Sequence, residues 1–72
     1  MNYYQRLRDL REDRDLKQED IAKLLGIAQN QYSRYERGEN MMTIDRYIKL
    51  AIFYNVTLDY ITGITNEPKP IK

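Results

Sequence analysis

Apolar residues recur every three or four positions along most of this chain, which is the spacing of amphipathic helices. No segment shows the sustained alternation of apolar and polar residues that marks a β-strand. The pattern predicts five short helices, over residues 2–13, 18–25, 29–37, 43–54 and 57–62. We therefore expect an all-α fold, built as a small helical bundle.

Residues that favour a left-handed backbone mark the ends of these helices. Gly26, Gly38 and Gly63 follow the second, third and fifth helices, and Asn55 follows the fourth. Thr43 is a good N-cap for the fourth helix. Each helix also carries apolar side chains from which a core can be built: Leu7 and Leu10; Ile21, Ala22, Leu24 and Leu25; Tyr32 and Tyr35; Ile44, Tyr47, Ile48, Ala51 and Tyr54; Leu58 and Ile61.

The second and third predicted helices are joined by only three residues, Gly26-Ile27-Ala28. A turn this short, with glycine at its start, makes the two helices cross steeply, which is the geometry of a helix-turn-helix. Near the C-terminus, Pro68 and Pro70 exclude a helix and favour extended neighbours. We therefore expect one domain over residues 1–63 and a flexible tail over residues 64–72.

The composition excludes several classes of function. The chain has no cysteine and no histidine, so it lacks disulfides, thiolate metal ligands and the commonest general base. No glycine-rich phosphate loop or paired-acid motif appears, and Glu36 is a lone carboxylate with no partner base or nucleophile. We expect no enzyme activity, no metal and no cofactor.

Charge and hydropathy exclude fewer classes of binding partner than the composition excludes classes of function. The longest uncharged apolar run, near residues 50–54, is too short to cross a membrane, and the first residues lack the apolar stretch of a signal peptide. We therefore expect a cytoplasmic protein with no membrane partner. The formal net charge is only +1, whereas nucleic-acid-binding domains usually carry a clear basic excess. Whether the chain binds nucleic acid must therefore be judged from the positions of its charged residues and not from their sum.

Three segments resemble the Cro/CI-type helix-turn-helix family of phage and bacterial transcriptional regulators. LKQEDIAKLLGI (residues 16–27) is similar to the family's second helix and turn, YSRYERG (32–38) to the end of its recognition helix, and VTLDYITG (56–63) to its last helix. The resemblance extends over about residues 6–63. It implies a lambda-repressor-like bundle whose second and third helices form the DNA-binding motif.

Three positions depart from the family pattern. Lys17 and Ala28 replace residues that usually cap the two helices of the motif, and Met42 replaces a common proline. Because each missing cap costs about 1 kcal/mol, we expect modest stability.

Helical geometry separates two sets of side chains on the predicted third helix. Tyr32 and Tyr35 face inward with Ile27, so the outer side and the N-terminal end carry the residues expected to read bases: Gln29, Asn30, Ser33 and Arg34. Glutamine and asparagine bond adenine through two hydrogen bonds, and arginine bonds guanine in the same way. A polar helix face is often only solvated, but its place in the motif favours contact with DNA.

Further residues are expected to position the DNA backbone or the motif itself. By the resemblance, Gln18 contacts a phosphate at the start of the second helix, although Glu19 and Asp20 follow it directly and would repel a phosphate unless they turn away. The residues expected to complete the phosphate contacts flank the reading face: Lys17, Gln31, Arg37, Asn40 and Thr43. The resemblance also implies a structural ion pair between Arg11 and Glu36.

Tyrosine is abundant, with seven in the chain, and Tyr3, Tyr4 and Tyr60 are hard to bury in so small a bundle. With Ile64 they form a candidate surface for self-association, since exposed aromatic patches often mark interfaces. A homodimer would supply a second recognition helix for a second half-site.

We therefore expect sequence-specific binding of double-stranded DNA by a homodimer, with repression as the outcome. The alternative is a protein-interaction module of the same fold, an antitoxin or antirepressor. The near-zero net charge favours that alternative, and the polar third helix argues against it, because protein interfaces prefer apolar and aromatic anchors.

Overall fold

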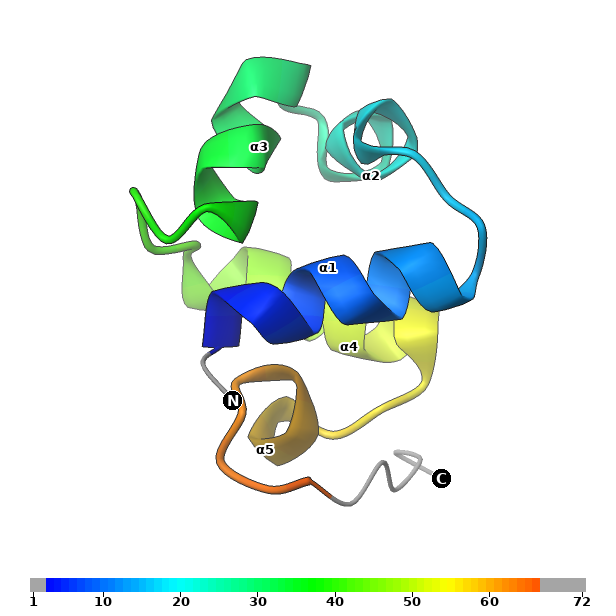
Figure 1. The fold of residues 1–72 in the computed structure, drawn as a ribbon, viewed down its shortest axis with the longest axis vertical. Helices are drawn as coiled ribbons and strands as arrows, with labels where there is room; N and C mark the ends of the chain where they lie inside the picture. The colour runs from blue at the N-terminus through cyan, green and yellow to red at the C-terminus, as the bar shows by residue number, and fades with distance from the viewer. Residues whose placement is uncertain (1–2, 67–72) are drawn as a thin grey trace.

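The computed structural model describes residues 3–66, which form five helices and no strand (Figure 1). The helices are α1 Tyr3–Asp13, α2 Gln18–Leu25, α3 Gln29–Glu36, α4 Ile44–Tyr54 and α5 Leu58–Ile61. The expected all-α bundle of five short helices is confirmed, and the five segments lie where the periodicity places them. In Figure 1, α1 runs across the middle, with α2 and α3 on one side of it and α5 on the other, and α4 lies behind it.

The core forms around α1, which packs against both α3 and α5. Leu7 of α1, Tyr32 of α3, Leu50 of α4 and Ile61 of α5 have no exposed surface. Burial of large apolar side chains such as these contributes roughly 1.5–3 kcal/mol each, which is what holds a bundle without disulfides. Met42, at the position of the common proline, is buried as well and adds to the same core.

Left-handed residues end the helices as the sequence indicates. Gly26 follows α2 with φ 73°, and Asn55 follows α4 with φ 57°. Gly38, with φ 76°, has a second constraint, because a Cβ there would lie 2.7 Å from Cε1 of Tyr4. Thr57 caps α5 by accepting a hydrogen bond from the Tyr60 amide, whereas Thr43 has the backbone conformation of an N-cap but makes no side-chain cap bond.

Three side chains expected in the core are exposed instead. Ile44 and Ile48 of α4 are 60% and 41% exposed, and Leu58 of α5 is 36% exposed. The buried face of α4 is formed by Tyr47, Leu50, Ala51 and Tyr54. Ile44 and Ile48 lie at one edge of that face, where no other helix covers them, so their helical spacing alone gave the wrong prediction.

Arg6 of α1 is buried although it is charged. Its guanidinium lies 4.0 Å from the ring centroid of Tyr60 and donates hydrogen bonds to the carbonyls of Tyr60 and Thr65 and to Oδ1 of Asn66. Residues 64–66, the start of the expected flexible tail, are therefore held against the bundle. The rest of that tail lies outside the described residues.

No helix within residues 3–66 is both long and apolar enough to span a membrane. The longest, α1 and α4, have 11 residues each, where a span needs about 20.

Candidate nucleic-acid interface

The turn between α2 and α3 is closed by backbone hydrogen bonds. The amide of left-handed Gly26 donates to the carbonyls of Ala22 and Lys23, and the amide of Ile27 donates to Ala22 at 3.0 Å. These bonds satisfy the last carbonyls of α2 and turn the chain sharply into α3. Figure 1 looks nearly along the axis of α2 while α3 runs upright in the same view, so the two helices cross steeply.

The outer side of α3 presents polar side chains to solvent. Gln29, Asn30 and Arg34 are all exposed and make no side-chain hydrogen bond within residues 3–66. On the opposite side, Tyr32 and Tyr35 are buried and pack edge to face, with their ring centroids 6.3 Å apart. The buried tyrosines thus fix which side of α3 faces outward.

Ser33 and Arg37 contact each other one turn apart on this helix. The Arg37 guanidinium donates to the Ser33 hydroxyl at 2.8 Å and also forms an exposed ion pair with Glu39. The hydrogen bond from Arg37 lowers the pKa of Glu39 and raises that of Arg37. Exposed ion pairs contribute little to stability, so a phosphate can replace Glu39 at small cost.

Gln31 shares a hydrogen-bond acceptor with a residue that the sequence did not indicate. Its amide donates to the Tyr35 hydroxyl at 3.3 Å, and Nη1 of Arg46 in α4 donates to the same oxygen at 2.6 Å. Arg46 therefore adds a cation beside α3. No sequence signal points to it, because this contact forms only when α4 folds back against α3.

Gln18 turns toward the protein interior, where its amide donates to Oε1 of Glu36 at 3.1 Å. The backbone amides of the first turn of α2 remain the groups that can hold a phosphate there. Lys17 is exposed, and its backbone amide donates to Oδ2 of Asp20 at 2.8 Å. Asp20 thus makes one half of a capping box at the start of α2, whereas the bond that a capping side chain at position 17 would accept is missing.

Glu36 and Arg11 form a two-pronged ion pair with Nε–Oε2 and Nη2–Oε1 distances of 2.8 and 3.0 Å. Their side chains are only 3% and 11% exposed. Burial alone would raise the pKa of Glu36, but the hydrogen bonds from Arg11 and from its other neighbours outweigh burial and lower it. The pair joins α1 to the end of α3, which is the contact that the resemblance implies.

Asn40 and Thr43 are both exposed in the connection between α3 and α4. Since Thr43 makes no cap bond, its hydroxyl is available to a ligand at the start of α4. Within residues 3–66, no three acidic side chains gather closely enough to hold a metal ion.

The tyrosines of the expected surface for self-association make contacts within the chain. Tyr3 and Tyr4 pack edge to face with ring centroids 5.3 Å apart, and Tyr60 stacks under Arg6. All three are half-buried, whereas Ile64 is 77% exposed.

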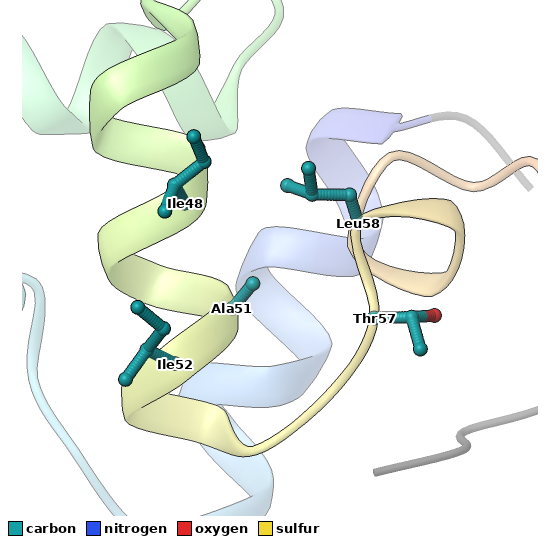
Figure 2. Close-up of a pocket in the computed structure, with 5 residues that line it drawn as sticks. All are labelled: Ile48, Ala51, Ile52, Thr57 and Leu58. Atoms are coloured by element: carbon teal, nitrogen blue, oxygen red, sulfur yellow. The ribbon is translucent and has the colours of Figure 1, made fainter. Parts of the chain in front are cut away.

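Exposed apolar residues gather on α4 instead, where a groove of about 400 Å³ runs between α4 and α5. Figure 2 shows the residues that line it: Ile48, Ala51, Ile52, Thr57 and Leu58.

Comparison with known proteins agrees with this geometry. A helix-turn-helix family model matches residues 7–61. The chain is 41% identical over 68 residues to the uncharacterised HTH-type transcriptional regulator YobD of Bacillus subtilis, covering 94% of this chain and 61% of that protein. It is 42% identical over 53 residues to the cryptic phage CTXphi transcriptional repressor RstR of Vibrio cholerae, covering 74% and 48%.

A solved structure gives the same result for the fold. The crystal structure of a transcriptional regulator from Listeria innocua superposes with a TM-score of 0.85 at 27% identity, over 92% of this chain and 62% of that one. The chain therefore spans about half to three-fifths of the length of these relatives. The relatives are named as regulators and not as enzymes, in agreement with the expectation from composition.

Proposed function

This chain belongs to the helix-turn-helix family, and from that premise we propose that it binds double-stranded DNA sequence-specifically, with α3 in the major groove. The observation that carries the proposal is the exposed side of α3. Gln29, Asn30 and Arg34 project there with no internal hydrogen bonds among the described residues, so their polar groups are available to base edges. The Ser33 hydroxyl accepts a hydrogen bond from Arg37, so it becomes available to a base edge when Arg37 contacts a phosphate instead.

The backbone of the DNA would be held from both ends of the motif. Lys17 and the first amides of α2 lie at one end, and Asn40 and Thr43 follow α3 at the other. Arg37 and Arg46 are cations beside α3 itself, and each phosphate that a cation neutralises releases counterions and strengthens binding. Local charge therefore compensates for the net charge of only +1.

We further propose that two copies bind together and repress transcription by occupying the DNA. One recognition helix contacts only a few base pairs, so a single copy would select a short and frequent sequence. RstR, which matches three-quarters of this chain, is named as a transcriptional repressor.

The test is selection of binding sites from a pool of random duplexes with the purified full chain, repeated at several salt concentrations. We expect an enriched sequence with two-fold symmetry and an affinity that falls steeply as salt rises. Arg34→Gln should lower the affinity at one base pair by about 1–3 kcal/mol and relax the preference there. Arg46→Gln should weaken binding to all sequences alike and reduce the salt slope by about 1.

The matched control is Arg8→Gln, because Arg8 is exposed on α1 and its side chain makes, among residues 3–66, one long ion pair with Glu12 at 3.9 Å. Arg8→Gln should leave both the affinity for DNA and its salt dependence unchanged. A folded protein that enriches no sequence would refute the proposal and favour the protein-interaction alternative.

A further inference from the structure

One flank of α4 carries three isoleucines at a spacing of four residues. Ile44, Ile48 and Ile52 are 60%, 41% and 66% exposed, and they lie on the same side of the helix because four residues nearly complete a turn. Leu58 of α5, 36% exposed, faces this stripe across the groove (Figure 2). A continuous apolar stripe of this kind on a small domain marks an interaction surface.

We infer that this stripe receives a second copy of the same chain, with the two α4 helices packed antiparallel about a two-fold axis near Ile48. The inference rests on the proposed function insofar as that function needs two copies. It places the contact surface on the stripe of α4 and on Leu58, and no longer on the expected surface of Tyr3, Tyr4, Tyr60 and Ile64.

The groove has a shape that accepts a partner's side chain. Ala51 is a small residue among its lining residues, and Ile48, Ile52 and Leu58 are the large ones. In an antiparallel pair centred on Ile48, Ile52 of one copy lies opposite Ile44 of the other, so the stripe of one copy contacts the equivalent stripe of its partner. Two-fold interfaces need this self-complementarity.

Charge at the edge of the stripe favours the same arrangement. Asp45 and Lys49 border the isoleucines on the solvent side, are both exposed, and make no ion pair within the part of the chain that the structure describes. With a rise of 1.5 Å per residue, an antiparallel copy brings Asp45 within about 3 Å, measured along the axis, of the partner's Lys49.

The size of the surface indicates a weak dimer. The exposed parts of the four apolar side chains offer roughly 400 Å² per copy, and stable complexes bury about 1,200–2,000 Å² in total. We therefore expect association to depend on protein concentration and to strengthen when DNA holds two copies together, since tethering raises their effective concentration.

The experiment compares the full chain with Ile52→Glu and with the control Ile64→Glu, which places the same substitution on an exposed isoleucine outside the stripe. Sedimentation velocity over a range of concentrations measures self-association, and circular dichroism checks the fold. We expect Ile52→Glu to remain monomeric where the wild type and Ile64→Glu associate. Association of Ile52→Glu at the wild-type level would overturn the inference, as would loss of association in Ile64→Glu alone.

DNA binding separates this inference from the proposed function. On the selected duplex with two half-sites, Ile52→Glu should lose about 100-fold in affinity through lost cooperativity, while its affinity for a single half-site stays unchanged. If half-site binding also fails in a folded Ile52→Glu, the stripe belongs to the DNA-binding surface and the inference is wrong. If the wild type binds no DNA, the proposed function fails, and sedimentation still decides on the dimer.

A charge exchange gives an independent check of the antiparallel arrangement. Asp45→Lys and Lys49→Asp should each weaken association, because each sets like charges opposite one another across the two-fold axis. The double variant should restore it. A double variant that associates more weakly than both single variants would contradict the antiparallel pairing.

Discussion

Glu36 joins three segments of the bundle through one carboxylate. It accepts hydrogen bonds from Arg11 of α1 and from Gln18 at the start of α2, and Arg11 also donates to the Leu16 carbonyl before α2. The Gly26 turn links the end of α2 to the start of α3, and Glu36 links the start of α2 to the end of α3. The angle between the two motif helices is thus fixed at both ends.

Arg11→Met tests this link, because it leaves a buried carboxylate without its cation. We expect the free energy of unfolding at pH 7 to fall by about 3–5 kcal/mol. In the wild type the lowered pKa of Glu36 gives stability that is present above the ordinary value of 4.5 and is lost as the pH falls through the folded-state value. In Arg11→Met burial acts without its main opposing interaction and raises that pKa, so the variant should approach the wild type in stability as the pH falls.

Urea unfolding of both proteins at pH 7 and at pH 4 measures the difference. Arg8→Met removes an exposed cation from the same helix and should change stability by less than about 0.5 kcal/mol. An equal loss at both pH values in Arg11→Met would mean that lost packing, and not the buried charge, causes the effect.

Helix positions followed from the sequence because their signals are local, whereas among contacts between helices only the Arg11–Glu36 pair was expected, and that came from the family resemblance. Gly26 and Asn55 end their helices by their own backbone preference. The width of the buried face of α4 depends on what packs against it, and this is why Ile48 was misplaced. The bond from Arg46 to Tyr35 joins residues 11 positions apart, and no periodicity encodes such a bond.

The start of α3 offers a test of helix capping. Ala28 is exposed and already has the extended backbone of an N-cap, with φ −72° and ψ 149°, but it has no side-chain acceptor. Ala28→Ser should raise the free energy of unfolding by about 1 kcal/mol, because its hydroxyl can accept a hydrogen bond from an amide of the first turn. Ala28→Val fits the same backbone without an acceptor and should give no gain in urea unfolding. Equal effects of the two substitutions would contradict the capping explanation.

At the scale of the whole molecule, the cations have two separate uses. Arg6 and Arg11 of α1, and Arg14 directly after it, are committed to internal contacts, Arg14 through the Tyr54 carbonyl at 2.9 Å at the end of α4. Those on the motif and beside it, such as Arg34 and Arg46, lie next to the exposed face of α3. Net charge is therefore a poor guide to the charge beside α3, because internal arginines and surface acids enter the same sum.

The size of the bundle limits the spacing of half-sites if two copies bind while in contact. The longest Cα dimension is 29 Å, so equivalent α3 helices in two touching copies lie less than about twice that length apart, a range that includes the 34–36 Å of one turn of DNA. Five base pairs inserted between the half-sites turn them to opposite faces of the duplex and should abolish cooperative binding. Ten inserted pairs restore the face but add about 34 Å, more than the longest dimension of the bundle, so cooperativity should stay lost. Fluorescence anisotropy with the three duplexes measures this, and recovery with ten inserted pairs would mean that the two copies do not touch.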